Sequence, residues 1–183
     1  MTKSPHHAPI HLLALRVREI AQLFNSMDPT PFLNKDLDPE AEAFIETWAS
    51  GFATDSHFQI TIHLEQFPSE SDLIDLLTAA IHNHFSYKAE RTRTSLKHLL
   101  QQGRMSLVIG LVFVSLCLFA ADAIGNLGAN TGLTIARESL TIVGWVAMWR
   151  PLQTFLYDWW PLQRKIRCYE NLGNSQIHVV QVK

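Results

Sequence analysis

Motifs that carry familiar chemistry are missing from this chain of 183 residues. It has no glycine-rich loop that could cradle a phosphate, no nucleophile elbow and no closely spaced pair of cysteines. These absences exclude the usual signatures of nucleotide hydrolases, serine hydrolases and thiol redox enzymes. We therefore expect a protein that is not an enzyme, with no catalytic residue, no cofactor and no bound metal.

Strong charge and abundant cysteine are missing too. The formal net charge is −2, and no block of basic residues occurs. Proteins that bind nucleic acid need such a block to neutralise phosphates, so no nucleic acid is expected as a partner. The two cysteines are Cys117, inside an apolar run, and Cys168, beyond a second one, and no disulfide between them is expected.

What the chain does contain is a long apolar run at residues 106–124, which only Asp122 interrupts. About 19 helical residues span the hydrocarbon core of a bilayer, which is roughly 30 Å thick. The run follows a long polar region and is therefore not an N-terminal signal peptide. It predicts an integral membrane protein whose first transmembrane helix covers residues 105–124.

A second apolar stretch predicts another transmembrane helix at residues 133–150. Residues 125–132 between the two are uncharged and rich in glycine and asparagine, which is typical of a tight external turn. Because basic residues favour the cytoplasmic side of a membrane, both termini are predicted to lie in the cytoplasm. The basic residues that flank the two spans are Lys88, Arg91, Arg93, Lys97, Arg104, Arg164, Lys165 and Arg167.

Residues 151–167 predict a kinked, amphipathic continuation that lies in the membrane interface. Pro151 lacks an N–H group and disturbs a helix, and the apolar residues after it recur at helical spacing. A ligand-binding aromatic box is the alternative interpretation of the aromatic side chains here. The residues expected to anchor the chain at the interface are Trp145, Trp149, Tyr157, Trp159 and Trp160.

Four ionisable residues fall in or beside the predicted spans: Asp122, Arg137, Glu138 and Arg150. Such groups are costly in lipid and usually face water, protein or an opposite charge. We expect Asp122 and Arg137 to meet as a solvated pair near the turn, and Arg150 to extend to the inner headgroups. The alternatives are an ion or proton path between several copies, and a salt bridge from Arg150 to another helix or to a lipid phosphate.

Residues 1–104 predict a cytoplasmic α+β domain, in which a small sheet packs with helices. Residues 57–65 alternate between apolar and polar side chains, as in a strand with one buried face. Residues 11–17 are apolar and short enough for a second strand, and a helix is the alternative because their alternation is imperfect. In a cytoplasmic tail of residues 168–183, residues 176–182 predict a third strand that can join the same sheet.

The domain's helices are predicted from capping signals. Asp38 followed by Pro39 marks the start of a helix that ends at Gly51. A further helix begins near residue 73 and, since no proline follows before the first span, continues into the membrane. The side chains expected on the buried face of the first of these helices are Ala41, Phe44, Ile45 and Trp48.

The nine histidines do not suggest a metal site by their spacing. His57 and His63 share a strand face but lie about 20 Å apart. His82 and His84 point in different directions from a helix.

Three acids, Asp28, Asp36 and Asp38, lie close together in a proline-rich segment. Turn and cap roles account for them. Binding of a cation, or acid–base catalysis, is the alternative.

Residues 22–45 (QLFNSMDPTPFLNKDLDPEAEAFI) and 141–165 (TIVGWVAMWRPLQTFLYDWWPLQRK) resemble a family of small bacterial inner-membrane proteins with two spans and no assigned activity. With the first span between them, the resemblance covers most of the chain. It implies a bacterial inner-membrane location and supports the two-span topology. It supplies no catalytic residue.

Three functions follow from this sequence. The leading hypothesis is a non-catalytic accessory subunit or scaffold that docks a partner or self-assembles as a homo-oligomer. The second is a homo-oligomeric ion-conducting or transport component, with Arg137, Glu138 and Arg150 along a path between copies. The third is a membrane-bound enzyme that uses the acidic residues between 28 and 38.

Overall fold

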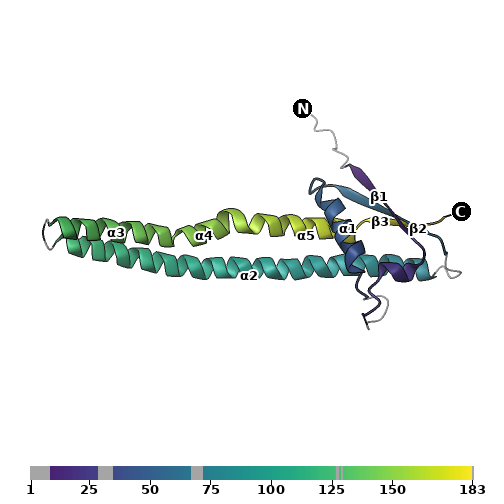
Figure 1. Ribbon diagram of the computed structural model, residues 1–183, viewed down its shortest axis with the longest axis horizontal. Coiled ribbons are helices and arrows are strands. Elements are labelled where there is room, and N and C mark those ends of the chain that lie inside the picture. The colour runs from purple at the N-terminus through teal and green to yellow at the C-terminus, as the bar shows by residue number, and fades with distance from the viewer. Residues whose placement is uncertain (1–8, 29–34, 67–71, 127, 129, 183) are drawn as a thin grey trace, which may run out of the picture. The chain divides into compact units, whose positions relative to one another are not determined.

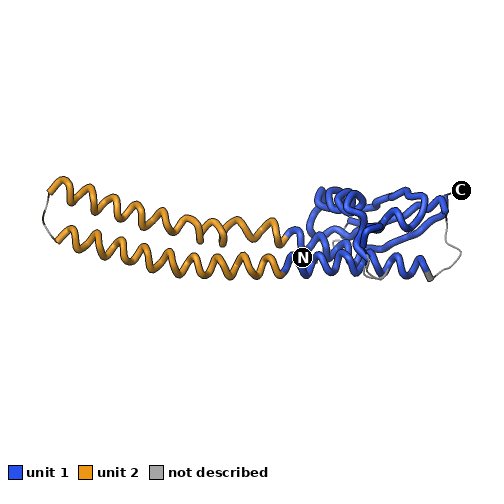
Figure 2. Tube along the Cα trace, turned by 60° about the horizontal axis from the view of Figure 1, so that its bottom comes forward, with its two compact units in different colours: residues 1–93, 164–183 blue, residues 94–163 orange. Residues whose placement is uncertain are grey.

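The chain forms two compact units (Figure 2). Unit 1 comprises residues 1–93 and 164–183, and unit 2 comprises residues 94–163. The computed structural model describes residues 9–28, 35–66, 72–126, 128 and 130–182.

Unit 1 contains a three-stranded sheet in the order β1-β2-β3 (Figure 1). Its strands are β1 (Ile10–Val17), β2 (His57–Leu64) and β3 (Gln176–Gln181). The three strands expected from the sequence are confirmed, including the C-terminal one, which pairs with β2. The alternation in β2 has the expected cause, because its even-numbered apolar residues are buried while its odd-numbered residues are half-buried or exposed.

Both strand pairs are parallel, so unit 1 is a mixed α/β structure rather than the expected α+β domain. Parallel neighbours require a crossover connection. The helix α1 (Pro39–Ser50) lies in the connection from β1 to β2. The connection from β2 to β3 contains all of unit 2, together with α2 (Asp72–Gly125) and α5 (Trp159–Gly173). Alternation identifies a strand but not the direction in which it pairs.

The start of α1 follows its predicted capping signal. One carboxylate oxygen of Asp38 accepts hydrogen bonds from the N–H groups of Glu40 at 2.9 Å and Ala41 at 3.3 Å. Ile45 is buried as predicted, but Phe44 is 55% exposed, which corrects the expected buried face. Successive residues differ by about 100° around a helix, and the face that α1 buries is too narrow to include Phe44.

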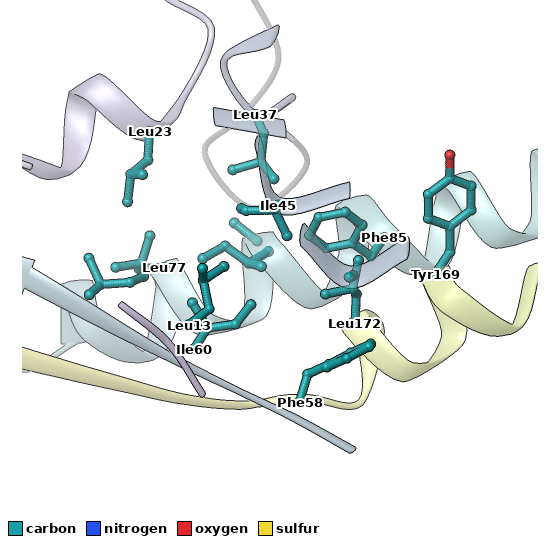
Figure 3. Close-up of a cluster of buried hydrophobic side chains, with 14 of the residues drawn as sticks. Leu13, Leu23, Leu37, Ile45, Phe58, Ile60, Leu77, Phe85, Tyr169 and Leu172 are labelled. Atoms are coloured by element: carbon teal, nitrogen blue, oxygen red, sulfur yellow. The ribbon is translucent and has the colours of Figure 1, made fainter. Parts of the chain in front are cut away.

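The core of unit 1 lies between one face of the sheet and three helices (Figure 3). Phe58 and Ile60 of β2 meet Ile45 of α1 and Phe85 of α2, and Leu172 of α5 completes the group. A 3₁₀ turn, η1 (Ile20–Leu23), adds Leu23. The end of α5 is therefore part of a packed core, although the sequence predicts an interfacial segment up to residue 167 followed by a tail.

In unit 2, α2 continues without interruption through Gly103. The returning segment is divided into α3 (Thr131–Ala147), α4 (Trp149–Gln153) and a π-helical turn, η3 (Thr154–Asp158), which leads into α5. Pro151 lies inside α4, and regular α-helix gives way to the wider π turn three residues later. We call residues 94–125 the first leg and residues 131–158 the second leg.

Glycines bring the two legs into direct contact. A Cβ atom added at Gly144 would lie 3.1 Å from Cβ of Cys117, and one added at Gly110 would lie 3.1 Å from Sδ of Met148. At Gly103 it would lie 3.0 Å from Cγ2 of Thr154. Residue numbers rise along one leg as they fall along the other, so the legs are antiparallel.

One of the described helices is long and apolar enough to cross a membrane, by its length and composition: the stretch Leu73–Gly125. Only 17% of its most apolar part is buried. The helix α3 has 17 residues and does not reach the required length by itself.

Candidate functional site

A cavity of about 350 Å³ in unit 1 is bordered by a group of charged side chains. Its wall comes from α1, α2 and α5 and from the segment before α1. We call Asp36, Glu42, Glu46, His84 and Lys88 the ionic cluster. The residues that line the cavity are Asn25, Asp36, Leu37, Pro39, Glu42, His84, Tyr87, Lys88, Arg91, Thr92 and Tyr169.

His84 lies at the centre of the ionic cluster, and its side chain is 4% exposed. Its Nδ1 lies 3.2 Å from Oδ1 of Asp36, and its Nε2 lies 3.2 Å from Oε2 of Glu42. The second contact lacks hydrogen-bond geometry, so the buried Nε2 has no hydrogen-bond partner. His84 therefore faces one carboxylate from the segment before α1 and another from α1 itself.

Lys88 follows His84 by one turn of α2. Its Nζ contacts Glu42 and lies 2.5 Å from Oε1 of Glu46. It also lies 5.5 Å from the centre of the Tyr169 ring. Residues spaced four apart share one face of a helix. The carboxylates of Glu42 and Glu46 on α1 thus face the basic groups of His84 and Lys88 on α2.

Burial sets the protonation of this cluster. It lowers the pKa of His84 below its usual 6.5, against the opposing influence of Asp36. Burial likewise lowers the pKa of Lys88. Burial and the neighbouring Glu46 raise the pKa of Tyr169 to about 12. The imidazole of His84 and the phenol of Tyr169 are therefore both neutral at pH 7.

The arrangement favours cohesion rather than catalysis. A general base must present its nitrogen to a substrate, whereas Nε2 of His84 is buried against Glu42. The amine of Lys88 is engaged by two carboxylates. Within the described residues, no group of three or more histidine, cysteine or acidic side chains is arranged to hold a metal ion. The cluster joins α1, α2 and the segment before α1.

The three acids of the proline-rich segment divide between two roles. Oδ2 of Asp28 accepts a hydrogen bond from the N–H of Asp36 at 2.7 Å, and Asp38 caps α1. These are the turn and cap roles expected from the sequence. The side chain of Asp36 reaches the cluster through its Oδ1, 3.2 Å from Nδ1 of His84.

His82 and His84 point in different directions, as predicted. Nε2 of His82 lies 2.9 Å from the main-chain oxygen of Ser175, whereas His84 faces the cavity wall. His57 is exposed at the start of β2 and His63 is half-buried near its end.

Sequence analysis did not identify four important residues of this site, namely Glu42, Glu46, Lys88 and Tyr169. The available signal was the pair of four-residue spacings, Glu42 with Glu46 and His84 with Lys88. Neither spacing alone reveals that α1 and α2 place these faces against each other.

The charges predicted for the membrane are separated along unit 2. Asp122 and Arg137 do not form the expected ion pair within 4.0 Å, although both belong to the described chain. The Arg137 guanidinium lies instead beside Gly125, where an added Cβ would be 3.5 Å from its Cζ. Glu138 shares a shallow hollow on α3 with Arg137, and Arg150 is exposed in α4.

The predicted aromatic anchors are mostly exposed. Trp145, Trp149, Tyr157 and Trp160 have exposed fractions between 64% and 73%. Trp159 packs against Trp160 with 5.7 Å between ring centres. These side chains are available to surroundings outside the chain.

Comparison with protein-family models, curated proteins and solved structures gives no match to this chain. The resemblance to a bacterial two-span family stays a prediction. Function is therefore argued from geometry.

Proposed function

We propose that this chain is a two-span integral membrane protein that serves as a non-catalytic scaffold subunit. In this proposal unit 2 crosses a bacterial inner membrane and both termini lie in the cytoplasm. Unit 1 is the cytoplasmic part, and the exposed faces of both units dock a partner.

The observation that carries the proposal is the apolar surface of unit 2. Large apolar side chains are exposed along both legs, whereas soluble monomers rarely expose contiguous apolar patches above a few hundred Å². Hydrocarbon is the solvent that suits such a surface. Exposed examples are Val108, Ile109, Val112, Leu116 and Phe119 on the first leg, and Ile142, Trp145, Val146, Trp149 and Leu156 on the second.

Contacts between the legs set the proposed depth of the second span. Gly103 faces Thr154, and the end of the first span near Gly103 is therefore level with η3. Gly125 faces Arg137, so the other end is level with the first turns of α3. The second span therefore comprises roughly residues 137–155, which is long enough to cross. It is shifted towards the C-terminus from the predicted 133–150 and includes Pro151.

A scaffold role agrees with how the chain uses its special residues. The ion pairs of the ionic cluster form inside unit 1, and Nε2 of His84 is buried. In unit 2, Gly110, Gly144 and the buried Cys117 are occupied by packing between the legs. The surfaces left over are the exposed apolar faces, which suit contacts with lipid and with other helices.

Insertion and orientation are tested together. Membranes containing the full chain are washed at alkaline pH, which removes peripheral proteins, and the chain should remain in the pellet. A reporter fused after Lys183 should be active only in the cytoplasm, and the same reporter inserted at Gly128 only outside. Release into the wash, or an active external reporter after Lys183, would contradict the proposal.

The scaffold role has its own experiment. Single-particle imaging of gently solubilised full-length protein should show a heteromeric assembly. A symmetric ring of this chain with a water-filled axis would favour conduction instead. A ligand bound beside Asp36 or His84 would favour an enzyme.

A further inference from the structure

Arg150 is an exposed charge of unit 2 whose surroundings lack an opposite charge. In the part of the chain that the structure describes, no carboxylate lies within 4.0 Å of its guanidinium. Gly110 packs against Met148 and Pro151, so Arg150 is level with residues near 110 of the first leg. If unit 2 crosses the bilayer as proposed above, Arg150 lies about 6–9 Å deeper than Arg104, because each helical residue rises 1.5 Å.

The direction of the helix opposes escape to the inner headgroups. The Cα–Cβ bond of a helical residue tilts towards the helix N-terminus. For α4 that end faces the middle of the bilayer, so the side chain of Arg150 starts out away from the cytoplasm. Arg104 lies on α2, which runs the opposite way, and its side chain starts towards the cytoplasm. An anion within the bilayer would therefore stabilise a guanidinium at the depth of Arg150.

A second copy of this chain does not supply that anion. Glu138 precedes Arg150 by twelve residues, which is about 18 Å along a helix. Asp122 lies twelve residues beyond Gly110, so it is about as far away in depth. Asp158 lies about 12 Å to the cytoplasmic side, and its carboxylate accepts a hydrogen bond from Thr154 at 3.4 Å. Copies of the chain inserted in the same orientation place equivalent residues at the same depth, so these differences in depth also hold between Arg150 of one copy and the carboxylates of another.

We infer that the face of the second leg around Arg150 binds a transmembrane helix of a different protein, which carries an aspartate or glutamate one to two turns inside the cytoplasmic boundary. Exposed apolar and aromatic side chains surround the arginine, with Trp145 at 64%, Val146 at 66% and Trp149 at 73%. Tryptophan and arginine are enriched among the residues that contribute most to binding at protein–protein interfaces. The ion pair selects the partner, and the apolar side chains supply contact area.

The test uses the full-length chain in phosphatidylcholine vesicles with a leucine-rich transmembrane probe helix. The probe carries a single Glu one and a half turns from its cytoplasmic end, and the control probe has Leu there. Energy transfer between labels measures binding. The wild type should bind the Glu probe about 10-fold more tightly than the Leu probe. Arg150→Leu should abolish this preference, Arg150→Glu should transfer it to a Lys probe, and the exposed Lys97→Leu should retain it.

Each other outcome overturns the inference. Equal preference in the wild type and Arg150→Leu would make Arg150 irrelevant to helix selection. If the wild type showed no preference for the Glu probe but bound phosphatidylglycerol in a way that depends on Arg150, the anion would be a lipid headgroup. Loss of self-association in Arg150→Leu would identify a second copy. The vesicles are first washed at alkaline pH. If the wild-type chain is washed away, the proposed function is overturned together with this inference. If the chain stays inserted but shows no preference for the Glu probe, only this inference is overturned.

Discussion

Unit 1 and unit 2 sort the same kinds of side chain in opposite directions. Unit 1 has a core of buried large apolar residues, in which Ile60, Ile62 and Phe85 are fully buried. In unit 2 the comparable residues point outwards, with Phe119 77% exposed. Within unit 2, Gly103, Gly110 and Gly144 lie in close contact with the opposite leg.

If unit 2 spans a membrane as we propose, each unit is folded against a different solvent. Water drives apolar side chains into a core, so a core holds unit 1 together. Lipid is as apolar as leucine, so helices in it associate through close packing of small residues. The chain therefore needs two kinds of stabilisation, and each can be removed by its own substitution.

The largest effect is expected from truncating a core residue of unit 1. Phe85→Ala removes a fully buried ring and should lower the free energy of unfolding of unit 1 by about 3–5 kcal/mol. Phe119→Ala, the matched change in unit 2, should cost less than about 1 kcal/mol, because an exposed ring loses few protein contacts. Hydrogen exchange is measured in the intact chain. The β2 amides report the effect of Phe85→Ala, and the α2 amides near residue 119 report the effect of Phe119→Ala. Similar losses in both would remove the distinction between the units.

A smaller effect is expected from separating the two legs. Gly144→Leu places a side chain where even a Cβ would lie 3.1 Å from Cys117, and overpacking of this kind costs about 1–3 kcal/mol. Nothing lies within 4 Å of a Cβ added at Gly132, so Gly132→Leu is the control. In a Cys168→Ser background, the temperature at which Cys117 becomes reactive to a thiol dye should fall for the first variant only. An unchanged temperature would show that the legs do not depend on this contact.

Local patterns in the sequence account for the elements of unit 1. Alternation in β2 and the cap at Asp38 each depend on a few neighbouring residues, so strand and helix could be predicted directly. The parallel pairing of the strands could not, because it depends on where two crossover connections return, one of which is more than a hundred residues long. The expected meeting of Asp122 and Arg137 failed for a related reason: the offset between the legs places Arg137 beside Gly125.

The candidate site was harder to predict than the fold. Asp36 and His84 stand out in the sequence only as residues with ordinary roles. The ionic cluster exists because α1 lies against α2 with two four-residue spacings in register. That register is set by packing of the core, so no local pattern contains it.

The cluster should make the stability of unit 1 depend on pH. Because burial lowers the pKa of His84, the unfolded chain binds a proton near pH 6.5 that the folded chain takes up only at lower pH. Stability should therefore fall as the pH drops from 6.5 through the folded pKa. Chemical unfolding of the intact chain between about pH 5 and 8 measures this slope. His84→Gln should flatten it and the exposed His57→Gln should not; an unchanged slope in His84→Gln would assign it to other groups.

The smallest effect is expected where unit 1 faces water. Arg16 and Glu65 form an ion pair at 3.2 Å, but their side chains are 67% and 41% exposed. Solvent and salt weaken such a pair, so Arg16→Ala should cost less than about 1 kcal/mol, and less still at high ionic strength. The Lys88 and Glu46 side chains are 27% and 29% exposed, so Lys88→Ala should cost more and vary less with salt. Urea unfolding of both variants at low and high salt separates the two cases. If the exposed pair proved as costly as the enclosed one, solvent exposure would not account for the strength of these ion pairs in unit 1.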